Sequence, residues 1–357
     1  MRSWSVLRAL TLLALLVLPA WTWAVAAAQD DGPYVLWEGR EAKVLRLREG
    51  RLQQEKLLPP YRLELPGVST DPLRLDPAPS RPARATFPEP ERILAVSDVH
   101  GAFDALVKLL IAQGVVNEEL RWRFGRGHLV VVGDVFDRRD KVTEILWFLR
   151  SLEGAAERAG GRVHLVLGNH EAMVLRGDLR YLNPKYQALA KIEGVGTLSQ
   201  LYGRDSELGR WIRNRPALLR LGRFLFIHGG PSPDLAKRGS SLESLNAAVR
   251  RGLDAEGPDP ELDFLYGPLG PIWYRGLIPG ADRARECPPD AIGPLLKAFG
   301  ASSVVVGHST LERASAFHGG QVYGIDAGFK DGKPGEAWIF EKGKILRGLA
   351  DGRREAF

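Results

Sequence analysis

The amino-acid sequence predicts an α/β protein. Between residues 92 and 310 the chain repeats one order of segments: an apolar run, a turn with glycine and polar side chains, and a segment whose apolar residues have helical spacing. Continuous runs of Val, Leu and Ile are typical of strands that are buried on both faces. With 357 residues, 45% hydrophobic and 26% charged, the chain has the composition of a globular protein with one large domain or two small ones.

The first 28 residues differ from the rest. Two arginines accompany an apolar run, a proline follows this run, and three alanines come directly before Gln29. This pattern predicts a secretory signal peptide, and therefore a periplasmic or secreted protein with no membrane association after cleavage. The alternative is an uncleaved membrane anchor, because the same segment is about long enough to span a bilayer.

Two short segments separate this start from the main domain. Residues 29–66 alternate apolar and polar side chains around Gly39 and Gly50, which predicts a small β appendage. Residues 67–90 contain repeated prolines, which predict an extended connector. The remaining residues, 91–357, are predicted to form the domain that carries the chemistry.

The charge and the cysteine content limit the classes of function. The formal net charge of +6 falls to +4 without the first 28 residues, which contain two arginines and no acidic residue. This excess suits an anionic substrate but is too diffuse for a nucleic-acid surface, so no nucleic-acid partner is expected, and a solvated basic surface explains it equally well. The single cysteine, Cys287, excludes an intramolecular disulfide and a multi-thiolate zinc site, and we expect it to be a packing residue.

Polar side chains follow five of the predicted strands, each beside a glycine that allows a sharp bend. They are Asp98 and His100; Asp134, Asp137 and Arg138; Asn169 and His170; His228; and His308. Ligands of such sheets lie beyond the carboxyl ends of the strands, so we expect the five groups to converge on one site.

Six of these side chains form a mixed set of oxygen and nitrogen donors that suits divalent first-row metal ions. They are Asp98, His100, Asp134, Asn169, His228 and His308. Six ligands are too many for one tetrahedral ion, so the count predicts two ions that share a carboxylate, an arrangement that serves in-line displacement at phosphorus. Each motif alone is weak, and the three other histidines, His128, His164 and His318, have no acidic neighbour and are predicted to be structural.

Five motifs in order, "SDVHG", "GDVFDRRD", "GNHE", "HGG" and "GHS", resemble the signatures of metallophosphoesterases of calcineurin-like fold, in the phosphoprotein phosphatase branch. Within that branch, "NHEAMVLRGDLRYLNPKY" and "GPIWYRG" are similar to the Shewanella-like protein phosphatases. The resemblance implies a sandwich of two β-sheets flanked by helices, with residues 91–357 as the catalytic domain.

The resemblance also implies a role for each site residue. Asp98, His100 and Asp134 would hold one metal ion, and Asp134, Asn169, His228 and His308 would hold the other. Manganese is the expected metal, with iron or zinc as alternatives. His170, oriented by Asp137, would protonate the leaving oxygen, while Arg138, Asn169 and, by looser analogy, Arg275 would contact the phosphate. A hydroxide shared by the two ions would attack phosphorus in line, and Glu171 would support the ligands or the start of a helix.

Two positions depart from the family pattern. Ser97 stands where glycine usually precedes the first aspartate, and Arg139 replaces the glycine of Asp-Arg-Gly, so the backbone of this loop and the substrate preference are in question. The segment "LRGDLRYLNPKYQ" that follows is either a lid with Arg176 and Arg180 as anion contacts or a surface helical hairpin.

Three functions remain open at this stage. The leading one is a phosphatase that hydrolyses phosphomonoesters of phosphoproteins or phosphopeptides. The second is a hydrolase of small phosphate compounds such as nucleotides or dinucleoside polyphosphates. The third is a non-enzymatic binding module, which the complete ligand set argues against.

Overall fold

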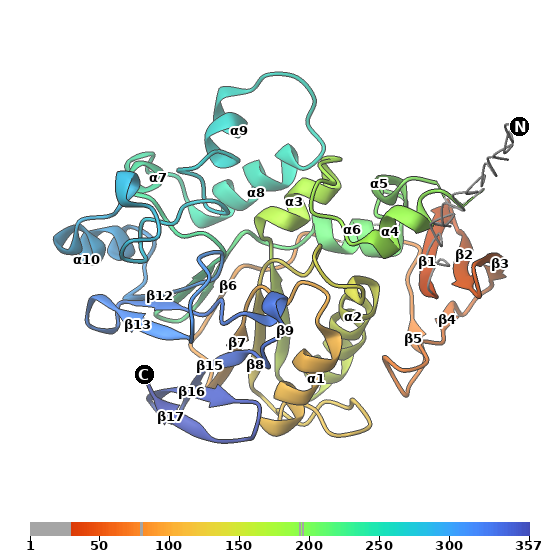
Figure 1. Cartoon of the computed structure of the whole chain (residues 1–357), viewed down its shortest axis with the longest axis horizontal. Helices are drawn as coiled ribbons and strands as arrows, with labels where there is room; N and C mark the ends of the chain where they lie inside the picture. Colours follow the sequence, from red (N-terminus) through yellow and green to blue (C-terminus); the bar gives the residue numbers. More distant parts are fainter. Residues whose placement is uncertain (1–29, 79–80, 193, 195) are drawn as a thin grey trace, which may run out of the picture.

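A computed structural model describes residues 30–78, 81–192, 194 and 196–357. The predicted signal peptide lies outside these residues. The described chain forms two six-stranded β-sheets that face each other, with helices on the outer faces (Figure 1). This arrangement is the predicted two-sheet sandwich.

The first sheet has the strand order β17-β16-β15-β7-β8-β9. Its strands are β7 (Arg92–Val96), β8 (His128–Val132), β9 (Arg162–Val166), β15 (Glu336–Glu341), β16 (Lys344–Leu349) and β17 (Arg354–Ala356). Strands β7, β8 and β9 run parallel, whereas β15 pairs antiparallel with β7. The C-terminal strands β15, β16 and β17 therefore belong to the same sheet as β7 and β8, which the first two groups of polar residues follow.

The second sheet has the order β13-β14-β12-β11-β10-β6. Its strands are β6 (Thr86–Phe87), β10 (Leu218–Leu221), β11 (Phe224–Ile227), β12 (Ser303–Val306), β13 (Ser315–Phe317) and β14 (Val322–Gly324). β6 lies inside the predicted extended connector, and it pairs in parallel with β10 at the sheet edge. An edge strand tolerates nearby prolines because one side of its backbone needs no partner.

The helices cover the outer faces of both sheets and build the surroundings of the site. They are α1 (Phe103–Ala112), α2 (Val142–Arg158), α3 (Asn169–Leu175), α4 (Pro184–Leu189), α5 (Leu198–Leu201), α6 (Glu207–Arg213), α7 (Pro233–Lys237), α8 (Leu242–Gly252), α9 (Pro260–Leu265) and α10 (Pro289–Ala298). Among the described residues, no helix is both long enough and apolar enough to cross a membrane.

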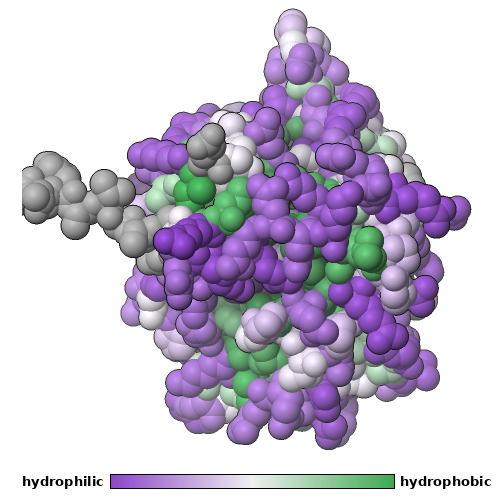
Figure 2. Space-filling model, turned by 90° about the vertical axis from the view of Figure 1, so that its right-hand side faces the viewer, coloured by the Kyte–Doolittle hydropathy of each residue, from purple (hydrophilic) through white to green (hydrophobic). Residues whose placement is uncertain are grey.

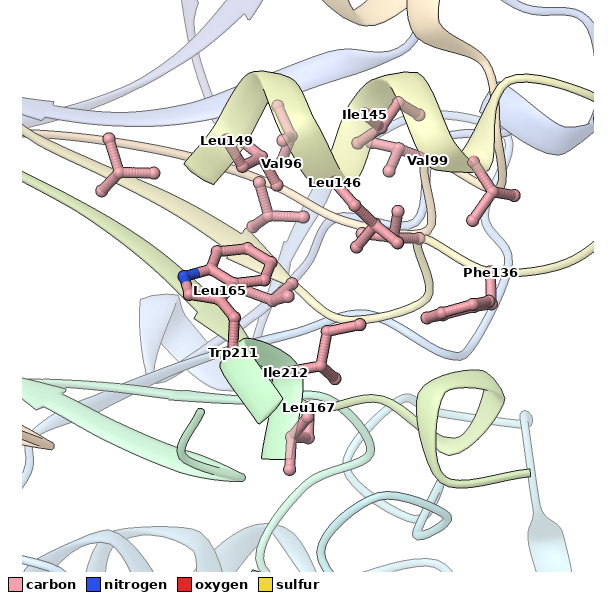
Figure 3. Close-up of a cluster of buried hydrophobic side chains, with 14 of the residues drawn as sticks. Val96, Val99, Phe136, Ile145, Leu146, Leu149, Leu165, Leu167, Trp211 and Ile212 are labelled. Atoms are coloured by element: carbon pink, nitrogen blue, oxygen red, sulfur yellow. The ribbon is translucent and has the colours of Figure 1, made fainter. Parts of the chain in front are cut away.

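Alternate residues of the central strands enter two different cores. Ile93 and Val130 belong to the core between the sheets, whereas Leu94, Val96 and Leu129 belong to the larger core on the helical side. Figure 3 shows part of the larger core, where Val96 and Leu165 lie with side chains of α2 and with Trp211 and Ile212 of α6. Burial on both faces explains why these strands are continuous apolar runs.

Residues 29–66 contain the predicted β-strands, in the described part from residue 30 onward. β1 (Asp31–Glu38), β2 (Glu41–Arg48) and β3 (Arg51–Leu57) form an antiparallel sheet, followed by the short pair β4 (Arg62–Leu63) and β5 (Leu73–Arg74). The sheet joins the main core: Trp147 Nε1 of α2 donates to Pro33 O at 2.8 Å, and Trp37 Nε1 donates to Glu207 Oε2 of α6 at 3.0 Å. It is therefore packed against the main domain rather than set apart from it.

The face of the molecule that carries this N-terminal sheet is mainly hydrophilic. Figure 2 shows charged and polar residues over most of it, with separate small apolar areas between them. The exposed strand β3 contributes several polar side chains to this face. The apolar side of the N-terminal sheet is turned inward, toward α2 and α6.

Candidate active site

The five polar groups follow the ends of five strands, as the sequence predicts. Asp98 and His100 follow β7, Asp134 follows β8, Asn169 opens α3 after β9, and His228 and His308 follow β11 and β12. All six predicted ligands are buried, with at most 4% of their surface exposed. Each sheet contains parallel strands: β7, β8 and β9 in the first and β11 and β12 in the second. The carboxyl ends of these strands lie at the same edge of the sandwich, so the side chains that follow them meet there.

Asp134 lies at the centre of the cluster. Its Oδ2 atom is 3.2 Å from Nε2 of His228, 3.7 Å from Nε2 of His100 and 3.8 Å from Nε2 of His170. Two groups of ligand atoms close enough to hold a cation share Asp134: one with His100 and His170, the other with His228 and His308. This sharing is what the ligand count predicts for a bridging carboxylate.

The imidazoles are oriented by backbone carbonyls. Nδ1 of His100 is 2.7 Å from the carbonyl oxygen of Phe136, and Nδ1 of His228 is 2.7 Å from that of Val132. The His100 ring, which donates from Nδ1, presents the lone pair of its Nε2 toward Asp134. In His308 the other ring nitrogen is held: Nε2 lies 3.1 Å from the carbonyl oxygen of Trp273, which leaves Nδ1 for a cation. Such carbonyl-oriented imidazoles are typical metal ligands, so the residues fit divalent cations.

Asp98, which is predicted to hold the first ion, belongs to neither of the two groups that share Asp134 and lies beside them, as does Asn169. Oδ1 of Asn169 is 3.0 Å from Nε2 of His228. Oδ2 of Asp98 accepts a hydrogen bond from the backbone N–H of His308 at 3.0 Å and lies 2.6 Å from Oγ of Ser97, while Oδ1 faces His100 at 3.9 Å. Ser97 therefore orients Asp98, which accounts for one departure from the family pattern.

The buried carboxylates of the cluster need positive charge close to them. Burial, with a further contribution from Asp326, raises the pKa of Asp98 to about 8. Burial alone would lower the pKa of His228, yet Asp134 and Asp98 raise it to about 10. Burial lowers the pKa of His100 to about 4, so that ring is neutral near pH 7. Buried carboxylates are stable only when cations or hydrogen bonds compensate them, and divalent ions would supply that charge here.

Glu171 supports the ligands from behind. Its carboxylate is fully buried and accepts hydrogen bonds from the backbone N–H groups of Gly168 at 2.7 Å, Asp134 at 2.9 Å, Val135 at 2.7 Å and Phe136 at 3.3 Å. It thus joins the start of α3 to the turn after β8. This agrees with the predicted supporting role.

Close packing explains two glycines of the motifs. A Cβ atom on Gly168 would lie 2.2 Å from Oδ1 of Asp134, and one on Gly307 would lie 1.9 Å from Oγ of Ser97. No side chain fits at either position without displacing the ligands. The glycines of "GNHE" and "GHS" are therefore required by space at the site.

Six non-glycine residues of the site have left-handed backbone conformations. Their φ angles are 54° for Asp98, 42° for His100, 56° for Asp134, 70° for Asp137, 70° for Arg138 and 64° for His308. Each such conformation costs on the order of 1–3 kcal/mol and persists only where the surroundings hold it. Arg139 is not among the residues with positive φ, so the expected strain at Arg139 does not occur and falls on its two predecessors instead.

His170 and Asp137 form a pair beside the ligands. Nδ1 of His170 is 2.5 Å from Oδ2 of Asp137, whose side chain is fully buried. Burial opposes protonation of His170, but Asp134 and Asp137 outweigh it and raise the pKa of this imidazole. The ring is therefore suited to carry a proton, although its Nε2 also belongs to one of the two candidate cation groups.

Two arginines, Arg138 and Arg275, are predicted to contact the phosphate. Arg138 is exposed, and its guanidinium lies 4.3 Å from the ring centroid of Tyr181, which in turn lies 5.4 Å from the ring of His170. Arg275 donates to the carbonyl oxygen of His308, and its Nη2 is 3.4 Å from Nδ1 of His308. Arg275 thus contacts a predicted ligand directly, whereas Arg138 is linked to His170 through the ring of Tyr181.

The segment after α3 is not the predicted helical hairpin, and its two arginines are not the predicted anion contacts. Residues 176–183 form a loop that leads to the short helix α4, rather than a helical hairpin. Arg176 donates to the carbonyl oxygen of Gly252 and lies over the ring of Tyr266, and Arg180 is exposed and pairs with Asp178. Neither arginine is directed at the ligands by these contacts.

Sequence reasoning missed two residues of this region. Asp326 is fully buried, lies 2.7 Å from Oγ1 of Thr310 and contributes to the raised pKa of Asp98. It follows β14 in "VYGIDAG", which has the same order of apolar run, glycine and acid as the recognised motifs. Tyr181 carries no such signal, because its contact with His170 arises from the fold alone.

A two-sheet sandwich with carboxylates and imidazoles converging at its strand ends defines a metal-dependent phosphoesterase. The chain belongs to the calcineurin-like phosphoesterase family, since the model of that family matches residues 91–310.

The match to a solved structure extends beyond this region. The crystal structure of a cold-active protein-tyrosine phosphatase of a psychrophilic Shewanella species is 33% identical, with a TM-score of 0.83, and the alignment covers 92% of this chain and 99% of that one. An uncharacterized protein of Schizosaccharomyces pombe is 29% identical over 69% of this chain and 76% of its own length. Shewanella-like protein phosphatase 2 of Arabidopsis thaliana is 40% identical over 28% of this chain and 25% of that protein. The resemblance drawn from the motifs is thereby confirmed.

Proposed function

We propose that this protein is a metal-dependent phosphatase that hydrolyses phosphomonoesters of phosphoproteins or phosphopeptides. One observation carries the proposal: two groups of buried ligand atoms share Asp134, and His170 of the first group also pairs with Asp137. The similarity to the Shewanella protein-tyrosine phosphatase over 92% of this chain supports the substrate class.

When bound, two divalent ions supply positive charge to the phosphoryl oxygens and lower the pKa of water. Asp98, His100, Asp134, Asn169, His228 and His308 would hold them. Manganese is our proposal for the ions, with iron or zinc as alternatives, and metal analysis of the purified protein decides between them.

The chain's own residues supply binding and proton transfer. Arg138 contacts the phosphate with a planar guanidinium that matches two phosphoryl oxygens, and Arg275 and Asn169 complete the contacts. His170, held by Asp137, donates the proton to the leaving oxygen. Tyr181 lies close enough to His170 to contact the organic part of the substrate.

The acid role of His170 is tested by comparing leaving groups. His170→Asn should leave the metal content unchanged and reduce turnover of a phosphoserine peptide by roughly 10²–10⁴, the usual contribution of a general acid. The loss should be much smaller for nitrophenyl phosphate, whose leaving group hardly needs a proton. Equal losses on both substrates, or loss of one metal ion, would show that His170 acts as a ligand or an electrostatic group instead.

Arg138→Ala is the matched comparison. It removes a phosphate contact, so both substrates should lose kcat/KM alike and bind more weakly. The same substrates, together with phosphotyrosine peptide and dinucleoside tetraphosphate, also test the substrate class. Faster hydrolysis of the dinucleoside compound than of every phosphopeptide would overturn the proposal in favour of the small-molecule alternative.

We also propose that the mature protein begins near Gln29 and resides in the periplasm or outside the cell. The support is the signal-like composition of the first 28 residues. Terminal sequencing of the protein purified from its cells is the test. An intact Met1 on a membrane-bound product would contradict cleavage.

A further inference from the structure

The N-terminal sheet places a buried carboxylate against the helix that follows the site. Asp31 of β1 is 2% exposed, and its Oδ1 lies 3.1 Å from Nζ of Lys185 at the start of α4, which is 7% exposed. Glu144 is the other carboxylate near this ammonium, at 3.6 Å. A buried charge that loses its partner is strongly unfavourable, so each residue fixes the position of the other.

Hydroxyl groups hold Asp31 in place. The Tyr34 hydroxyl donates to Oδ2 of Asp31, and Thr143 Oγ1 lies 3.4 Å from the same oxygen. The hydroxyl of Tyr202 is 3.0 Å from Oγ1 of Thr143. Asp31 is thus anchored to β1 and to the beginning of α2, and it presents its other oxygen to Lys185.

Helix α4 also contacts the loop between β8 and α2. Nζ of Lys185 donates to the carbonyl oxygen of Asp140 at 2.6 Å. The hydroxyl of Tyr186 donates to the same carbonyl oxygen at 3.1 Å and accepts from the backbone N–H of Val142 at 2.9 Å. The backbone of residues 140–142 is therefore held from the side of α4.

The residues just before α4 hold Arg138 in the same way. The backbone N–H of Arg138 donates to the carbonyl oxygen of Tyr181 at 3.3 Å, and Asn183 Nδ2 donates to the carbonyl oxygen of Arg138 at 2.8 Å. Asn183 also caps α4, because its Oδ1 accepts from the backbone N–H of Lys185 at 2.9 Å. Residues 181–183 thus hold both the backbone N–H and the backbone carbonyl group of Arg138, whose φ is 70°.

We propose that the Asp31–Lys185 pair positions the phosphate-binding loop, so that the N-terminal sheet is part of the catalytic apparatus. The pair fixes α4, α4 fixes the backbone at Arg138 and Asp140, and that backbone sets where the Arg138 guanidinium and the Asp137 carboxylate lie. Asp31 and Lys185 are positioning residues, because in the described part of the chain neither contacts the ligand cluster, and Lys185 reaches the loop through the carbonyl oxygen of Asp140. The inference rests on the proposed function of Arg138 as a phosphate contact.

The test is a double-mutant cycle between Asp31 and Arg138. Asp31→Asn keeps the shape of the side chain and removes its charge. We expect kcat/KM for nitrophenyl phosphate to fall roughly tenfold, within the range of up to about 100-fold that small misplacements cause. Most of the loss should appear in KM and in the inhibition constant of inorganic phosphate. In an Arg138→Ala background the same substitution should have little further effect.

Matched variants separate positioning from general destabilisation. Glu41→Gln removes a carboxylate from the same N-terminal sheet, where Glu41 pairs with Lys56 on the surface and its side chain is 72% exposed, and it should leave kinetics and Tm unchanged. The combined variant Asp31→Leu with Lys185→Met removes both members of the pair, so that neither stays buried alone, and Glu144, which also loses Lys185, keeps contact with water through a side chain that is 25% exposed. It should fold and should show the same kinetic loss, because the contact to Asp140 is gone.

The outcomes are distinguishable. Equal kinetic losses from Asp31→Asn in the wild-type and Arg138→Ala backgrounds would overturn the positioning role, as would unchanged KM in the combined variant. Arg138→Ala with unchanged kcat/KM would overturn both the phosphate contact and the positioning inference. A wild-type protein that hydrolyses no phosphomonoester with any of the three metals would overturn the proposed function itself.

Discussion

Glu171→Gln is the substitution that most directly tests how the site is held together. The two carboxylate oxygens of Glu171 accept from two backbone N–H groups each: Oε1 from Val135 and Phe136, and Oε2 from Gly168 and Asp134. A glutamine has one acceptor oxygen, and its NH₂ group is a donor. Whichever way the amide is turned, two backbone N–H groups lose their acceptor and face another donor.

The expected cost follows from that count. A buried donor left without an acceptor costs about 1–3 kcal/mol, so two of them cost about 2–6 kcal/mol in total. A neutral amide is easier to bury than a carboxylate, which offsets part of the cost. We therefore expect the unfolding free energy to fall by about 3 kcal/mol, which corresponds to a decrease in Tm of about 6 °C if each kcal/mol shifts Tm by about 2 °C.

The assay is urea and thermal unfolding followed by two spectroscopic probes, with and without added manganese. Glu118→Gln is the control, because Glu118 is an exposed glutamate for which no polar contact is found in the described part of the chain. Metal affinity should also weaken in Glu171→Gln, since Asp134 and Asn169 flank the backbone that Glu171 holds. Stability within about 0.5 kcal/mol of the Glu118 control, the usual range for surface substitutions, would refute the reasoning.

Two further predictions concern the ligands and the buried histidines. Asp134→Asn should remove the shared carboxylate and reduce both metal content and turnover strongly, whereas His164→Asn should reduce neither, as elemental analysis and kinetics will show; two ions and full activity in the Asp134 variant would contradict the assignment. Burial lowers the pKa of His128 to about 4, and that of its partner His164, 3.0 Å away, well below 6.5. The unfolded chain then binds more protons than the folded one below about pH 6.5, so the unfolding free energy should fall as the pH drops from about 6.5 toward 4. Replacing both histidines with glutamine should flatten this dependence in unfolding titrations, and an unchanged slope would contradict it.

The ligands could be predicted because their signal is local in the sequence. Each one directly follows an apolar strand and stands beside a glycine, as Asp134 does after Gly133 and Asn169 after Gly168. Parallel strands then bring their ends together without further information. Asp326 follows the same order of residues and could have been found by the same reasoning.

The supports of the site could not be predicted in this way. Residues 29–66 show the alternation of strands, but alternation does not reveal what their buried face packs against, and it packs against α2 and α6. The left-handed conformations of Asp137 and Arg138 are equally hidden, because neither residue is a glycine. The backbone of Arg138 is held by Tyr181 and Asn183, which are more than 40 positions away, and the side chain of Asp137 is held by His170.

The difference between the ligands, which follow local motifs, and their supports, which do not, also bears on the extent of the similarity to known structures. The family model ends at residue 310, yet β15 lies between β16 and β7 in the first sheet, so the sheet that delivers Asp98 is completed by residues 336–341. Asp31 and Asp326 also lie outside 91–310: Asp31 contacts Lys185 of α4, and Asp326 contacts Thr310, two residues after His308. The motifs supply the ligands, whereas the strained loops that present them depend on segments at both ends of the chain. A structural match over 92% of the chain, rather than over the motif region alone, is what this dependence implies.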